Sequence, residues 1–160
     1  MLRWWIGLAA VISSLASAHD IYHERVDGYV PVIAHAGFMG LDTQATLSRV
    51  ECELANGQCV AVSANTQFVS EYGTQKMCCG WYLVAIAPNG QETWLVRTRG
   101  ENILSQNQHY INAAVCGFFK ADQEGLHAFE MRGYCGTFDL RKDGMISTTY
   151  NEIQILVFDE

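Results

Sequence analysis

The sequence predicts an α+β fold, a mainly antiparallel β-sheet with one or two helices stapled onto it by disulfides. Three observations lead to this prediction. Apolar and aromatic runs flank two Asn-Gly steps, at 56–57 and 89–90, as in β-hairpins. Apolar residues recur at helical spacing between 111 and 118. The chain of 160 residues also carries six cysteines, an even number that fits paired thiols.

The start of the chain is predicted to be a secretory signal peptide. Arg3 is followed by an apolar run over 4–12 and then by Ala16-Ser17-Ala18. A basic start, a short hydrophobic stretch and a small-x-small step are typical of a cleaved signal, and the run is shorter than the ~20 residues that span a bilayer. A buried N-terminal strand is the alternative. We therefore expect a signal peptide over 1–18 and a single secreted domain over 19–160.

The charge balance argues against nucleic acid and anionic membranes as partners. The chain has ten basic and seventeen acidic side chains and a net charge of −7, and cleavage of the leader would also remove Arg3. An acidic balance opposes binding to phosphate backbones and to anionic lipid surfaces. No segment after the leader is long and apolar enough to predict a membrane span. We expect neither a nucleic acid nor a membrane as partner.

The cysteines all lie in the expected mature chain, at Cys52, Cys59, Cys78, Cys79, Cys116 and Cys135. In an oxidising compartment this even count predicts three disulfides. A Cys78–Cys79 bond would need a strained vicinal ring, and excluding it leaves twelve of the fifteen pairings open. Neighbouring residues on an extended segment point to opposite faces. We therefore expect the two cysteines to form disulfides on opposite faces of one strand. A metal cluster is disfavoured because the spacings lack paired C-x-x-C units.

Two hairpins are predicted from the Asn-Gly steps, which readily adopt the positive φ angles of a tight turn. One joins the apolar runs on either side of Asn89-Gly90. Trp81, Tyr82 and Trp94 flank that turn among aliphatic residues, so we expect them in the core rather than on a sugar-binding platform. The other surrounds Asn56-Gly57, although the apolar residues over 43–54 also fit helical spacing and leave a helix there as an alternative.

The main helix prediction falls later in the chain. Ser105-x-x-Gln108 resembles a capping box, and an apolar stripe at helical spacing follows it, made of Ile111, Ala114, Val115 and Phe118. Cys116 would lie on this helix and tie it to the sheet. Downstream, segments 126–135, 136–140 and 152–158 are predicted strands, with a turn at 142–144.

A mature chain that begins at His19 would offer a metal site. The α-amine and ring nitrogen of an N-terminal histidine can chelate copper together with a second histidine, here one of His23, His35, His109 and His127. This start resembles the histidine brace of copper-dependent polysaccharide monooxygenases and their copper-binding relatives. His19 and His23 also have the H-x-x-x-H spacing of zinc-binding helices, although Asp20 stands where the general base is expected. The leading hypothesis has no metal and no cofactor, because a flexible terminus is the default.

A second enzymatic alternative is a ribonuclease. His35, Glu71, Arg97 and His109 follow one another in an order similar to that of small secreted fungal ribonucleases. In such a site two groups transfer protons while the guanidinium stabilises charge on a phosphate. The spacings are ordinary, and surface or hydrogen-bonded histidines are the simpler interpretation. We therefore assign no catalytic residue.

The general plan of a leader, one small domain, six cysteines and an acidic chain resembles the small secreted cysteine-rich effector proteins of plant-pathogenic fungi. Within that group it is similar to the avirulence proteins of Leptosphaeria-type fungi. The resemblance covers the plan as a whole and transfers no functional residue. It implies a monomeric extracellular protein that binds a host or other extracellular protein, with entry into host cells left open. The ribonuclease and the copper protein are the alternatives.

Overall fold

A computed structural model describes residues 18–36, 44–69, 77–97, 102–104, 110–137 and 144–158. These residues form nine strands, β1 (Ala18–Ala36), β2 (Ala45–Leu54), β3 (Cys59–Val69), β4 (Met77–Ile86), β5 (Glu92–Arg97), β6 (Asn102–Leu104), β7 (Tyr110–Lys120), β8 (Gly125–Thr137) and β9 (Gly144–Phe158). No helix occurs in these ranges, so the predicted α+β class is wrong and the described fold is all-β.

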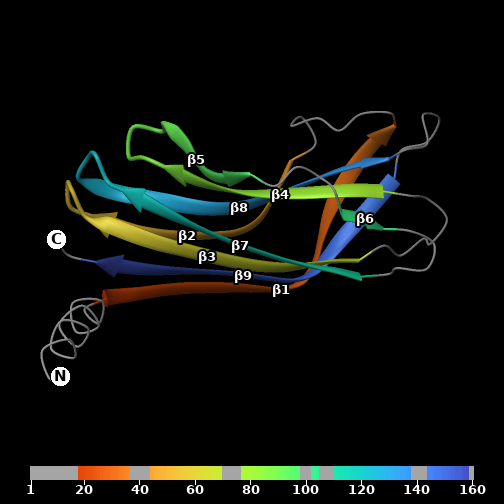
Figure 1. Cartoon of the computed structure of the whole chain (residues 1–160), viewed down its shortest axis with the longest axis horizontal. Coiled ribbons are helices and arrows are strands. Elements are labelled where there is room, and N and C mark those ends of the chain that lie inside the picture. Colours follow the sequence, from red (N-terminus) through yellow and green to blue (C-terminus); the bar gives the residue numbers. More distant parts are fainter. Residues whose placement is uncertain are drawn as a thin grey trace, which may run out of the picture.

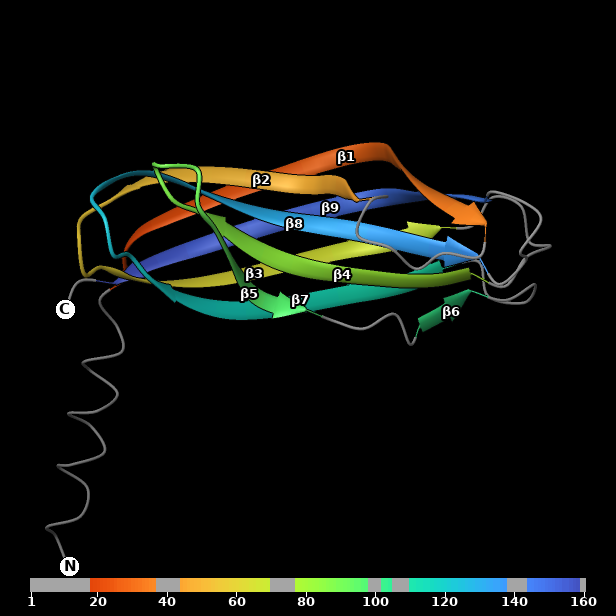
Figure 2. The same cartoon turned by 90° about the horizontal axis from the view of Figure 1, so that it is seen from above.

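The strands form two packed layers, a β-sandwich of jelly-roll type (Figures 1 and 2). One layer, here called sheet I, has the order β1-β9-β3-β7, and the other, sheet II, has the order β5-β4-β8-β2, with β6 beside β4. β1 belongs to both layers: it pairs antiparallel with β9, then bends, and its last three residues pair in parallel with β8 (Figure 1). Backbone hydrogen bonds therefore close one seam of the sandwich.

The core lies between the two sheets, and it forms because buried and more exposed side chains alternate along the strands with a period of two. Branched apolar side chains at every second position favour a strand and bury one of its faces. In β3 and β9 the inward residues are at most 3% exposed, namely Val60, Val62, Ala64, Ile153, Ile155 and Val157. Sheet II supplies the large side chains of Leu83, Phe129 and Met131 from the opposite side.

A small polar network lies inside this core. The buried hydroxyl of Thr66 on β3 donates to Asn151 Oδ1 on β9 at 2.6 Å. Asn151 Nδ2 in turn donates to Thr148 Oγ1 at 2.8 Å, and all three residues are at most 2% exposed. The network links β3 to β9, and its bonds offset the free-energy cost of removing these polar atoms from water.

The hairpin predicted at Asn89-Gly90 is confirmed. β4 and β5 pair antiparallel, and the Ala87 amide donates to the Gln91 carbonyl at 2.9 Å where the strands end. Gly90 has a φ of 83°, and its amide donates to the Ala87 carbonyl at 2.8 Å. A residue with a Cβ adopts such a φ only at a cost, which explains the glycine.

The hairpin predicted at Asn56-Gly57 is wrong. Gly57 has a positive φ of 95°, as a turn requires, but β2 pairs with β8 in sheet II and β3 pairs with β7 and β9 in sheet I. The turn therefore connects the two layers. The Gly57 amide donates to the Ala121 carbonyl, and the Ala121 amide donates to the Gln58 carbonyl. Ala121 belongs to the β7–β8 turn, which also connects the two sheets, so these bonds hold the two connecting turns together. The alternative helix over 43–54 is also wrong, because β2 occupies 45–54.

The helix predicted from the stripe at 111–118 is also wrong, because that segment is β7. Ala113, Val115 and Gly117 point inward and are buried, whereas the residues between them are exposed. The apolar residues at helical spacing are thus divided between the two faces of a strand. Ser105 and Gln108, which suggested a cap, lie outside the described residues.

Several strand predictions are confirmed and one turn stays open. The predicted strands over 126–135 and 152–158 fall within β8 and β9. The segment 136–140 is described as strand only as far as Thr137, at the end of β8. The turn predicted at 142–144 lies outside the described residues except for Gly144, which begins β9.

No disulfide staples the described part of the fold. The thiols of Cys52, Cys59 and Cys116 are free, and they are buried, half-buried and exposed respectively. Cys79 is buried on β4, opposite Cys135 on β8. The side chains of Cys78 and Cys135 lie outside the described residues, so the pairing of all six cysteines stays a prediction. Within the described residues the packed core joins the two layers and no disulfide does, which corrects the expected fold of helices stapled onto one sheet.

The described residues contain no helix of the length and apolarity that crossing a bilayer requires.

Candidate binding face

The outward side of sheet I is the candidate functional site and is here called the binding face. Because neighbouring strands are in register, outward side chains from the four strands form rows across it. One row consists of Ile21, Leu156, Ala61 and Phe118, from β1, β9, β3 and β7 respectively. The row nearest to the end of β9 contains Phe158, Cys59 and Lys120.

These two rows give the binding face an apolar half, made of Ile21, Leu156, Ala61, Phe118, Phe158 and Cys59. Phe118 is 81% exposed and Ile21 is 62% exposed. The other four side chains are half-buried. Single exposed apolar residues are ordinary, but a contiguous strip of them across four strands is typical of an interaction surface.

Two hollows flank Phe118. One has a volume of about 480 Å³ on the binding face and is lined by Cys59, Val60, Phe118, Phe119, Lys120 and Phe158. The other has a volume of about 400 Å³ at the seam between β7 and β5, where Trp94 and Leu95 join Phe118 and Phe119 in its lining. Apolar side chains of a partner could enter either hollow.

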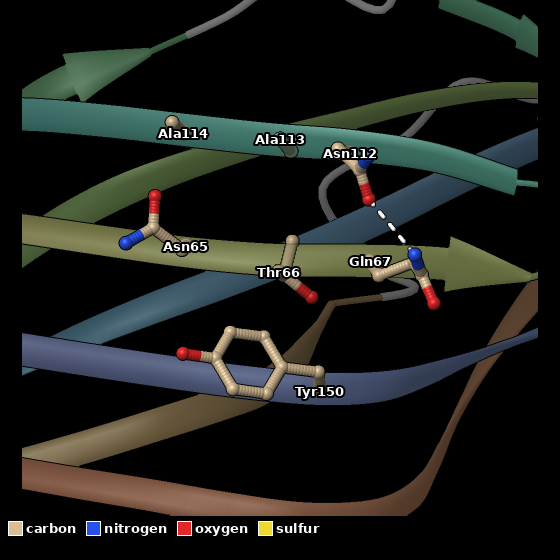
Figure 3. Close-up of a pocket in the computed structure, with 7 residues that line it drawn as sticks. All are labelled: Asn65, Thr66, Gln67, Asn112, Ala113, Ala114 and Tyr150. Atoms are coloured by element: carbon tan, nitrogen blue, oxygen red, sulfur yellow. Dashed lines mark hydrogen bonds between the residues drawn. The ribbon is translucent and has the colours of Figure 1, made fainter.

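The remaining rows form the polar half of the face, which contains a third hollow of about 320 Å³ (Figure 3). It is lined by Asn65, Thr66, Gln67, Asn112, Ala113, Ala114 and Tyr150. Gln67 Nε2 donates to Asn112 Oδ1 at 2.9 Å, and the Thr149 hydroxyl donates to Gln67 Oε1 at 2.8 Å. These bonds fix two amide side chains at the rim of the hollow.

A charged cluster borders this hollow on β1 and β9. The Arg25 guanidinium lies over the Tyr150 ring, 4.8 Å from its centre. The Tyr150 hydroxyl donates to Glu152, which also contacts His23 Nε2 at 2.7 Å. The hydrogen bond from Tyr150, followed by that from His23, lowers the pKa of the Glu152 carboxyl, which therefore stays ionised at neutral pH.

The outward side of sheet II carries an ion-pair ladder across its strands. Glu51, Arg49, Glu130, Arg132 and Glu92 alternate in sign, and their closest contacts lie between 2.5 and 2.7 Å. Glu130 accepts from both arginines and is 5% exposed. Each charge has at least one opposite partner, so we interpret the ladder as structural rather than catalytic.

The histidines of the copper and zinc hypotheses are only partly described. His19 and His23 both lie on β1, where four residues span about 13 Å, so the helical H-x-x-x-H geometry does not arise. His23 is paired with Glu152, and the side chain of His19 lies outside the described residues. His127 is fully buried, with Nδ1 2.9 Å from the Gly125 carbonyl. Within the described ranges no three metal-binding side chains come together.

The ribonuclease set is likewise mostly outside the described residues. The side chains of His35, Glu71 and His109 are not described, and Arg97 lies over the Trp94 ring at 5.1 Å. Trp81 and Tyr82 are buried as predicted. Trp94 is instead 41% exposed and stacks on Tyr82, so the prediction that all three aromatic residues lie in the core is wrong for Trp94.

The sequence did not indicate the residues that now define the site. The helical spacing predicts Phe118 on the buried stripe of a helix, and no sequence pattern predicts a role for Asn65, Gln67 or Asn112. No local signal could have found them, because the outward positions 114, 116 and 118 are Ala, Cys and Phe and do not alternate in polarity with the inward ones.

Comparison with known proteins supports the fold alone. No protein-family description matches the sequence, and no curated protein matches it. Solved structures of similar fold include a VP2 protein of infectious bursal disease virus in T=1 particles, with a TM-score of 0.62 and 9% identity over 86% of this chain and 31% of that chain. The structure of the Gt strain of that virus has a TM-score of 0.59 and 10% identity over 86% of this chain and 33% of that chain. This chain thus spans about a third of the length of these viral chains.

Proposed function

We propose that this protein is a secreted binding module whose ligand is another protein, extracellular or of a host. The observation that carries the proposal is the apolar strip Ile21–Leu156–Ala61–Phe118, which crosses the outward side of four strands and has its exposed side chains, Ile21 and Phe118, at its two ends. An apolar centre bordered by polar side chains is the usual anatomy of a protein–protein interface. Phe118, exposed between two hollows, is the expected anchor.

The charges near this strip are mostly acidic and favour a basic partner, although one cation, Lys120, lies at its edge. Asp20, Asp122 and Glu124 are exposed where β1 begins and where β7 turns into β8, at the same end of the sandwich as the apolar half (Figure 1). The whole chain has a net charge of −7. Acidic groups around an apolar centre would accelerate the approach of a protein surface that is apolar in the middle and basic at its edge.

The experiment compares the wild type with Phe118→Asp and with a matched control, Leu126→Asp. Leu126 is 49% exposed on sheet II, so the control adds the same charge to an exposed apolar position on the other layer. Each protein is immobilised and exposed to extracellular proteins of candidate hosts, and each captured protein is then purified and its affinity measured. We expect at least one purified protein to bind the wild type and Leu126→Asp, and to bind Phe118→Asp at least tenfold more weakly.

Two outcomes would overturn the proposal. One is that every purified protein binds Phe118→Asp as tightly as it binds the wild type. The other is that sedimentation shows a wild-type dimer that Phe118→Asp dissolves, since the strip would then be covered by a second copy. Binding to a basic partner should also slow as salt is raised.

A further inference from the structure

We propose that the hollow in the polar half of the binding face is a site for a neutral saccharide. The proposal goes beyond the protein-binding function, because it uses other residues and a ligand of different chemistry. It rests on the lining of the hollow and on the hydrogen bonds that hold that lining in place (Figure 3).

The lining selects for uncharged ligands with many hydroxyl groups. Three carboxamides, those of Asn65, Gln67 and Asn112, surround the hollow, and none of the described residues that line it is charged. A carboxamide presents an acceptor and a donor side by side, which matches the neighbouring hydroxyls of a sugar. A phosphate or carboxylate would find no cation in this lining. An apolar ligand would remove the amides from water without replacing their hydrogen bonds.

Two of the three amides, those of Gln67 and Asn112, are held in place before any ligand arrives. The chain of bonds from Thr149 to Gln67 to Asn112 occupies Gln67 Oε1, one hydrogen of Gln67 Nε2 and one lone pair of Asn112 Oδ1. No described residue accepts a hydrogen bond from Asn112 Nδ2, and none bonds the Asn65 amide. Side chains fixed in this way lose little conformational entropy on binding.

The Tyr150 ring would complete the site as an apolar wall. Figure 3 shows it on β9, alongside the amides of β3 and β7. Its hydroxyl is bonded to Glu152 and one of its faces is covered by Arg25, so the ring is held in a fixed position. The C–H groups of a sugar pack well against such a ring. Because Arg25 already occupies a stacking face, recognition would depend mainly on the amides.

The test is a titration followed by the side-chain amide signals of the ¹⁵N-labelled protein. The probes are neutral oligosaccharides of glucose, xylose, mannose and N-acetylglucosamine, with an acidic uronic-acid oligosaccharide and glycerol as comparisons. We expect one neutral oligosaccharide to shift the signals of Asn65, Gln67 and Asn112 in a saturable way. Asn112→Ala should weaken that binding at least tenfold, whereas Asn56→Ala, which removes an exposed amide in the β2–β3 turn, should leave it unchanged.

Three results would overturn this proposal. They are the absence of a saturable shift with every neutral oligosaccharide, equal binding by the wild type and Asn112→Ala, and a response to glycerol or to the acidic sugar as strong as to the neutral one. Phe118→Asp should retain saccharide binding, because Phe118 lies in the apolar half. That variant therefore separates failure of this site from failure of the protein-binding function.

Discussion

Tyr134 on β8 lies over Gly80, the residue directly opposite it on β4. A Cβ atom at position 80 would fall on the ring and hydroxyl of Tyr134. Tyr134 is only 5% exposed and also contacts Tyr82, with 6.3 Å between the ring centres. Because Gly80 has no side chain, the Tyr134 ring can lie over the outward side of sheet II at this position.

From this relationship we predict that Gly80→Ala destabilises the protein by about 1–3 kcal/mol, the usual cost of overpacking. The Tyr134 ring is rigid and buried, so it cannot move away without losing its contact with Tyr82. Urea denaturation measures the change. In a Tyr134→Ala background the clash is removed, and Gly80→Ala should then cost less; an equal cost in both backgrounds would contradict the explanation.

A second prediction concerns the polar network in the core. Asn151→Ala removes the acceptor of the Thr66 hydroxyl and the donor to Thr148, and leaves both hydroxyls buried. We expect a loss of about 2–3 kcal/mol in the free energy of unfolding, since buried groups without partners are costly. Asn65→Ala, which removes an exposed amide that no described residue bonds, should stay within about 0.5 kcal/mol of the wild type. Similar values for the two variants would mean that the network does not stabilise the core.

The thiols should differ sharply in reactivity. Burial, with smaller contributions from Glu53 and Asp20, raises the pKa of Cys52 to about 11, so this side chain holds almost no thiolate at pH 8. Cys116 is exposed and free. Iodoacetamide should therefore modify Cys116 in the native protein without reductant, and Cys52 only after unfolding, as mass spectrometry of peptides would show. A Cys116 that reacts only after reduction would instead support the predicted disulfides.

Acid should weaken the ion-pair ladder. The hydrogen bond from Arg132 lowers the pKa of Glu92 below its ordinary value of 4.5. A carboxyl whose pKa is lower in the folded state contributes stability above its unfolded pKa, and this contribution is lost as the pH falls through the folded pKa. The stability difference between the wild type and Glu92→Gln should thus be constant at pH 6–7 and shrink below pH 4.5. Glu124→Gln, in the exposed β7–β8 turn, is the control, and a parallel acid dependence of both variants would refute the role of Arg132.

The sequence predicted individual strands better than it predicted their partners. β8, β9 and the hairpin around Gly90 could be recognised because alternation and turn chemistry are local. The partners of β2 and β3 could not be recognised, because Asn56-Gly57 fixes only the geometry of its turn. Which sheet each strand joins depends on distant residues that bury the same face.

The helix prediction and the missed site have one cause. In β7 the stripe of Ile111, Ala114, Val115 and Phe118 satisfies helical spacing by chance, and short apolar runs do not distinguish the two periods. Once the segment is a strand, Phe118 and Asn112 turn outward together. The binding face then depends on the pairing of β7 with β3, which no local pattern encodes.

The pairing of β1 with β9 has a consequence for how the chain reaches this fold. Ile21 and Leu156 are partners although almost the entire described chain lies between them. During synthesis β1 therefore cannot pair with β9 until β9 has left the ribosome. The seam at which β1 joins both sheets is complete only after that step. Contacts this distant in sequence slow folding and leave strand edges exposed in the meantime, so assistance by chaperones would matter most in that interval.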